Sequence, residues 1–153
     1  MGLVVANNVG LSGLVAPKPD VQIFTATNGD WTKPAGCSRV YIEVIGGGGG
    51  GGGGRTDTSA KGGGGGGGGA MVRGIYDASA LPSTLTIVVA AEANGGVPHT
   101  GTSNGSAGNY SSVEGSGFIL KAFGGGAGSG DTNGLTSGGG GGGGGTGAIG
   151  SAG

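Results

Sequence analysis

The sequence predicts an all-β protein in which small β-sandwich-like strands are combined with packed glycine runs of the polyglycine-II type. Several short apolar segments alternate or are rich in β-branched residues, which is typical of strands. No segment carries an amphipathic helical pattern of useful length. Glycine supplies 47 of the 153 residues, and three uninterrupted runs occupy residues 46–54, 62–69 and 138–145.

Five segments are expected to form strands, and each ends at glycine or at a turn signal. The clearest is Ser38–Ile45, where apolar side chains alternate with Arg39, Tyr41 and Glu43. The segment Thr84–Ala91 is almost wholly apolar, which predicts a strand covered on both faces. The other three are Val21–Thr27, Ala70–Tyr76 and Gly117–Phe123.

Composition narrows the class of protein. The net charge is −1 and there is no basic cluster, so no nucleic-acid partner is expected. No stretch reaches 18 apolar residues, so no membrane insertion is expected. The apolar N-terminus lacks the positive segment of a signal peptide and is expected to be retained. One cysteine, Cys37, excludes an internal disulfide and is expected to be buried.

The chain divides into an N-terminal arm, residues 1–20, and a glycine-rich β domain, residues 21–153. The arm is either a segment that docks onto a neighbouring subunit or a frayed terminus. The domain holds few large apolar side chains for its length. Either the glycine runs pack as structure, or the protein depends on a partner or on copies of itself.

The residues alone leave two interpretations of the glycine runs open. A flexible linker is one, because glycine loses the most backbone entropy on folding. Against it, the runs contain no serine and have nearly equal lengths of nine, eight and eight residues. As polyproline-II-type helices they would each span about 25–28 Å and would have to donate hydrogen bonds sideways, to neighbouring helices.

The segment WTKPAGCSRVYIEVI followed by nine glycines, residues 31–54, resembles the glycine-rich domain of bacteriophage tail-fibre and related virion proteins. The resemblance continues through LPSTLTIVV, residues 81–89, and FILKAFGGG, residues 118–126, and covers about residues 21–146. It departs at Ala90–Ala93, where the family has more glycine. It implies packed polyglycine-II helices, with the intervening loops touching the host surface.

Catalytic, metal-binding and cofactor-binding chemistry is not expected. The only histidine, His99, and the only thiol lie in separate segments with no orienting carboxylate. The glycine runs match G-x-G-x-x-G trivially, and no Gly-Lys pair opens a helix as a phosphate-binding loop requires. Too few histidines, cysteines or clustered carboxylates are present for a metal site, and the loop aspartates are typical of Asx-turns.

Three polar loops are the candidate binding surface, because loops on a rigid scaffold carry recognition. They are residues 55–61, 97–110 and 128–137. Trp31 is expected in the core, whereas Tyr110 suits either a core position or stacking on a sugar. The candidate surface residues are Arg55, Thr56, Asp57, Thr58, Lys61, His99, Asn104, Asn109, Tyr110, Asp131 and Asn133.

The resemblance implies a structural protein of the virion, a tail-fibre, spike or baseplate component that contacts the host surface. Its expected partners are other virion proteins, further copies of itself and a bacterial surface glycan or protein. One alternative is a capsid or tail decoration protein with no receptor role. Another is an ice-binding glycine-rich protein, although such proteins are expected to have regular Gly-x-x triplets and disulfides.

Overall fold

The computed structural model describes residues 19–27, 29–56, 60–98, 103–131, 137–145 and 147–153, and the backbone of residues 3–9. Eight strands and one 3₁₀ turn occur in this part of the chain. The strands are β1 (Leu3–Val9), β2 (Asp20–Phe24), β3 (Asp30–Thr32), β4 (Cys37–Ile45), β5 (Met71–Asp77), β6 (Thr84–Val88), β7 (Ser111–Gly115) and β8 (Phe118–Ala122), and the turn is η1 (Ala78–Ala80).

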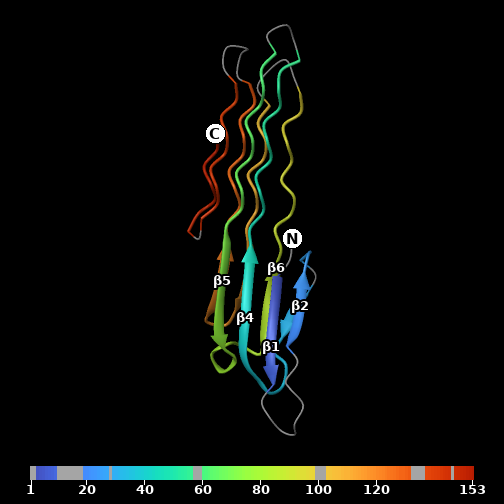
Figure 1. The fold of residues 1–153 in the computed structure, drawn as a ribbon, viewed down its shortest axis with the longest axis vertical. Coiled ribbons are helices and arrows are strands. Elements are labelled where there is room, and N and C mark those ends of the chain that lie inside the picture. Colours follow the sequence, from blue (N-terminus) through green and yellow to red (C-terminus); the bar gives the residue numbers. More distant parts are fainter. Residues whose placement is uncertain are drawn as a thin grey trace.

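Two four-stranded antiparallel sheets form a sandwich at one end of an elongated molecule (Figure 1). The first sheet has the order β2-β1-β4-β5, and the second has the order β3-β6-β7-β8. The longest ladder of the first sheet joins β4 to the edge strand β5, with Ile42 opposite Gly74 and Val44 opposite Val72. The predicted all-β class is therefore confirmed.

The hydrophobic core lies between the two sheets and is small. Alternating side chains of β4 point inward, so that Val40, Ile42 and Val44 are buried while their neighbours reach the outer face. Trp31 is buried as expected, at 1% exposure. The remaining large core side chains are Leu81, Leu85, Ile87 and Val113.

Sequence patterns located five strands and missed three. The missed strands β3 and β7 are short or polar, and they are held by ladders to β6 and β8. The expectation that the Thr84 strand is covered on both faces is wrong. In β6, Leu85 and Ile87 are buried whereas Thr84 and Thr86 are exposed, because the sheet is antiparallel and only its inner face meets the other sheet.

The N-terminal segment also differs from expectation. Leu3–Val9 forms β1, which pairs with β2 on one side and with β4 on the other. This part of the predicted arm lies within the first sheet of the sandwich. Cys37, at the start of β4, is half-buried rather than buried, and its thiol donates to the carbonyl oxygen of Arg39 at 3.4 Å.

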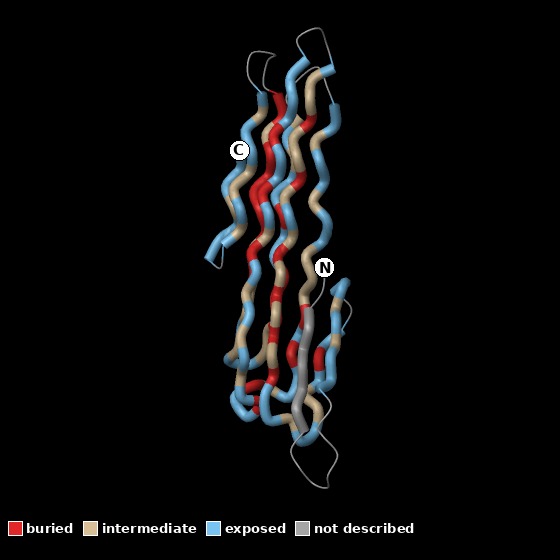
Figure 2. Tube along the Cα trace, in the orientation of Figure 1, coloured by how far each residue is buried: buried red, intermediate tan, exposed pale blue. Residues whose placement is uncertain are grey.

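Five strands, β4 to β8, continue beyond the sandwich as extended segments, most of them glycine-rich (Figure 1). We call these segments together the glycine bundle: residues 46–55, 61–70, 90–98, 103–110, 123–131, 137–145 and 147–153. Buried residues extend from the sandwich along the bundle (Figure 2). The end of the bundle remote from the sandwich is called the distal end below.

Candidate functional site

The glycine runs are held side by side by hydrogen bonds that repeat every third residue. Each bond runs from an N–H group of segment 46–55 to a carbonyl oxygen of segment 61–70, with N···O distances of 2.8–3.0 Å. The bonds join Gly46 to Ala70, Gly49 to Gly67, Gly52 to Gly64 and Arg55 to Lys61. The two segments are therefore antiparallel, and the bonds fix their register over their whole length.

A second row of bonds leaves the same segment in another direction. The N–H groups of Gly47, Gly50 and Gly53 donate to the carbonyl oxygens of Asn109, Ser106 and Ser103 at 2.7–2.9 Å. A three-residue repeat with lateral bonds is what polyproline-II-type helices, which make no internal bonds, require for packing. The linker interpretation is therefore wrong for the described runs, while their assignment to polyglycine II stays a prediction.

Segment 123–131 lies at the centre of the bundle. Backbone hydrogen bonds join it to five other segments: 46–55, 61–70, 103–110, 137–145 and 147–153. Nearly all of its residues are buried. A glycine segment thus takes the place that an apolar core fills in an ordinary domain, with hydrogen bonds and close backbone contacts replacing side-chain packing.

Close approach of the backbones explains why most of these residues are glycine. A Cβ atom added at Gly64 would overlap the carbonyl oxygen of Gly139, and one at Gly67 would overlap that of Gly142. A Cβ atom at Gly66 would overlap the carbonyl oxygen of Gly49 on the other side. Such overlaps recur at two of every three positions of the run 62–69.

The bundle brings the three predicted loops to the same end of the molecule. The described ends of these loops, Arg55 and Lys61, Pro98 and Ser103, and Asp131 and Ser137, lie at the distal ends of their segments (Figure 1). Hydrogen bonds fix their bases. Arg55 donates to Lys61 at 3.0 Å, and the Gly53 carbonyl accepts from Asp131 at 3.4 Å.

Two predicted site residues make contacts within this end of the bundle. Asp131 is fully buried, and its carboxylate lies 3.8 Å from the guanidinium of Arg55, whose side chain is 19% exposed. The expectation that Asp131 is a surface residue is therefore wrong, because its charge is paired inside the bundle. The exposed Asn104 accepts a hydrogen bond from the Gly130 N–H at 2.9 Å through its side-chain oxygen.

The other predicted distal residues divide into two groups. Thr56 and Lys61 are exposed beside the pair formed by Arg55 and Asp131. Four predicted residues lie outside the described part of the chain: Asp57, Thr58, His99 and Asn133.

Asn109 and Tyr110 are not at the distal end. They lie where segment 103–110 joins β7, so about six residues, or roughly 20 Å, separate Tyr110 from Asn104. The Lys121 ammonium lies 4.0 Å from the centre of the Tyr110 ring, and the Phe123 ring lies 6.5 Å from that ring. The cation occupies a ring face that a sugar would need for stacking, and this arrangement makes Tyr110 a poor sugar platform.

The described residues contain no group of three or more His, Cys, Asp or Glu side chains placed to hold a metal ion. No helix in the described part of the chain is long and apolar enough to cross a membrane.

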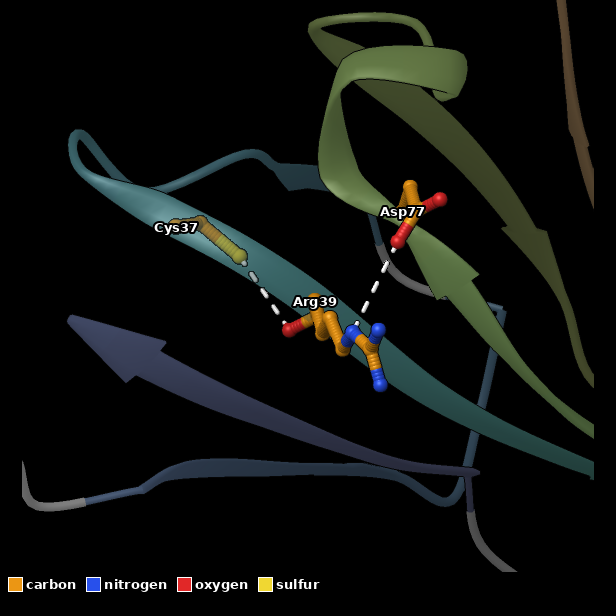
Figure 3. Close-up of polar contacts among 3 residues, drawn as sticks. All are labelled: Cys37, Arg39 and Asp77. Carbon is orange, nitrogen blue, oxygen red and sulfur yellow. Dashed lines mark hydrogen bonds and ion pairs between the residues drawn. The ribbon is translucent and has the colours of Figure 1, made fainter. Parts of the chain in front are cut away.

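The first sheet also exposes apolar side chains that were not predicted as a surface feature. They include Ile23 on the edge strand β2, at 63% exposure, and Ile75 on the opposite edge strand β5, at 67%. An ion pair between Arg39 and Asp77, at 3.6 Å, crosses from β4 to β5 on this sheet (Figure 3). The hydroxyl of Tyr41 donates to Glu43 at 2.7 Å, and this bond raises the pKa of Tyr41.

A family model described as a glycine-rich domain matches residues 25–153. The chain belongs to this glycine-rich domain family. No curated protein and no solved structure matches the chain.

Proposed function

We propose that the chain is a structural protein of a bacteriophage virion, a tail-fibre, spike or baseplate component whose distal loops contact the host surface. The observation that carries the proposal is that the described ends of the three polar loops lie together at the distal end of the bundle (Figure 1). The resemblance of residues 31–54 to virion proteins supports the same placement.

The bundle suits this role mechanically. Its segments are joined along their length by backbone hydrogen bonds, so the loop ends are fixed in relation to one another. The buried pair of Arg55 and Asp131 joins the bases of the first and third loops. Asn104 joins the second loop to the third through the Gly130 N–H. The loop sequences can therefore differ widely while the scaffold that presents them stays the same.

The site offers hydrogen-bonding groups and little net charge. Thr56, Lys61 and Asn104 are exposed at the distal end, and the charges of Arg55 and Asp131 are paired with each other inside the bundle. We infer that the target is a neutral, polar surface such as a glycan, bound through many weak hydrogen bonds.

The first test locates the chain in the particle. Immunogold electron microscopy of virions should label a fibre tip, a spike or the baseplate. Label confined to the capsid or tail tube would leave a decoration protein, and particles without label would overturn the virion assignment.

The second test separates host contact from structure. Phages are built in which the loop residues 56–60, 99–102 and 132–136 are replaced by Gly-Ser segments of equal length. Adsorption to the host should fall while particle assembly is unchanged. The control replaces the turn residue Ser116 between β7 and β8, in the sandwich, and should leave adsorption intact. Adsorption that survives all three loop replacements refutes the receptor role.

A further inference from the structure

One exposed part of the bundle is glycine although the fold does not require glycine there. Several exposed glycines share this property. Six of them lie on segment 61–70 or would bring an added Cβ atom closest to that segment, and we call these six the glycine face: Gly48, Gly62, Gly65, Gly68, Gly140 and Gly143. A Cβ atom added at Gly62, Gly65 or Gly68 would meet no atom within 4 Å. At the other three positions the nearest atom would be 3.7–3.8 Å away, which is ordinary contact.

Backbone conformation does not explain these glycines either. The described glycines with positive φ are Gly29, Gly36 and Gly117, none of them in a run. Replacing a glycine by alanine where φ and space permit stabilises a protein by about 0.4–1 kcal/mol. The run 62–69 therefore forgoes stability at every third position.

Another segment of the same bundle shows that outward positions can carry side chains. In segment 103–110 the outward row, again every third residue, is Asn104, Ala107 and Tyr110, all exposed. The glycine face lacks side chains because the three pure runs lie together, with segment 61–70 bonded to segment 46–55 on one side and to segment 137–145 on the other.

We propose that the glycine face is the interface between two copies of this chain, packed backbone against backbone. Segment 61–70 offers both hydrogen-bond donors and hydrogen-bond acceptors for this contact. The N–H groups of Gly62, Gly65 and Gly68 donate to no backbone carbonyl among the described residues, and the carbonyl oxygens of Gly63 and Gly66 accept from none. Donors and acceptors recur about every 9.3 Å along the segment, so an identical face offers the matching spacing.

The glycine face is large enough for a stable dimer interface when the adjoining part of the first sheet is included. The three runs are each about 25 Å long and about 5 Å apart, which gives roughly 400 Å². Segments 46–54 and 61–70 continue β4 and β5 on the same side of the molecule (Figure 1), where Met71 and Ile75 are exposed. Two strands about 25 Å long and about 5 Å apart add roughly 250 Å². The face then reaches roughly 650 Å² per copy, near the lower end of the range for specific stable interfaces.

Charge does not oppose self-association. The chain carries a net charge of −1. On the sheet part of the face, Arg39 is paired with Asp77, and Arg73 lies opposite Glu43 in the β4–β5 ladder. A two-fold interface presents the same surface twice, and this surface has no excess of either sign.

The test compares the full chain with two lysine variants by analytical ultracentrifugation. Gly65→Lys places a long side chain on the glycine face, and Ala107→Lys places the same side chain on the outward row of segment 103–110. The wild-type protein and Ala107→Lys should sediment as dimers of twice 13.9 kDa. Gly65→Lys should be a monomer, and its dimer Kd should rise by more than about tenfold. Its melting temperature should equal that of the wild type at a dilution where the wild type is also monomeric.

The proposal is overturned if the wild-type protein is monomeric at every concentration from about 1 to about 100 µM, because a dimer with a micromolar Kd would form within this range. A Gly65→Lys variant that still dimerises, or a wild-type species other than a dimer, would overturn it as well. If Gly65→Lys does not fold, Gly65→Ala serves instead, because its methyl group has room in one copy but separates two facing backbones. The outcome is independent of the host-contact proposal, which concerns the loops.

Discussion

Neighbouring glycines of one run should respond in opposite ways to the same substitution. Gly64 and Gly65 are adjacent in a uniform run, so in a flexible linker they would be equivalent. In the bundle they differ, because a Cβ atom at Gly64 would overlap the Gly139 carbonyl oxygen, whereas one at Gly65 would meet nothing within 4 Å. Gly64→Ala and Gly65→Ala therefore form a matched pair.

The loss of unfolding free energy expected for Gly64→Ala follows from two hydrogen bonds near Gly64. Relieving the overlap requires segments 61–70 and 137–145 to separate, which stretches the bonds from Gly138 to Gly62, at 3.0 Å, and from Gly141 to Gly65, at 2.9 Å. At about 1 kcal/mol each, and with strain from overpacking, Gly64→Ala should lose about 2–4 kcal/mol. Gly65→Ala should be neutral or gain up to about 1 kcal/mol.

The assay is differential scanning calorimetry of the two variants and the wild type, at a dilution where association does not contribute. Gly64→Ala should lower the melting temperature by roughly 5–12 °C, and Gly65→Ala should leave it unchanged or raise it slightly. Equal melting temperatures for the two variants would refute the packing of the runs. A larger loss at Gly65 than at Gly64 would refute the register of segments 61–70 and 137–145.

Three further predictions concern the bundle and the first sheet. In segment 46–55 the amides of Gly49 and Gly52 should exchange hydrogen slowly and that of Gly48 quickly, because only the first two donate to backbone carbonyls. Uniform exchange rates measured by NMR would contradict this hydrogen-bonding pattern of the glycine bundle. Asp131→Asn should cost about 2–4 kcal/mol of unfolding free energy, whereas Asp77→Asn, in an exposed pair, should cost less than about 1 kcal/mol in the same denaturant titration; equal costs would argue against a buried pair. Glu43→Gln should lower the pKa of Tyr41 toward 10.0, because its hydrogen bond to the carboxylate is what chiefly raises it. In the wild type that bond's contribution to stability is present at neutral pH and is lost as the pH rises through the raised pKa, and an unchanged ultraviolet titration in the variant would refute the assignment.

Much of the sandwich could be predicted from the sequence, because its longer strands carry their own signals. The alternation in Ser38–Ile45 located β4 and its buried face. By contrast, β7 contains a single large apolar residue, Val113, and is a strand because β6 and β8 pair with it on both sides. Burial on one face or two also depends on the neighbouring sheet, and for this reason the expectation for β6 was wrong.

The distal site was predictable in outline and not in its internal contacts. Polar loops beside glycine runs indicated where the segments end, and the bundle does place the described ends of the three loops together. Whether a charged loop residue faces solvent depends on a partner distant in sequence. Asp131 meets Arg55 only because segments 46–55 and 123–131 are neighbours in the bundle. A uniform run of glycines contains no information about which run lies beside which.

The same uniformity explains why the sequence could not separate two reasons for a glycine. Contacts within one chain require glycine at about two of every three positions, as at Gly66 and Gly67, where a Cβ atom would overlap a neighbouring backbone. They do not require it at Gly65 or Gly68, where a side chain has room. If slippage during replication alone maintained the runs, substitutions at the permitted third would be neutral or stabilising and would leave the oligomeric state unchanged. If a second copy packs there, the same substitutions would leave the folded monomer intact and abolish the dimer, so stability and association measured on one variant distinguish the two causes.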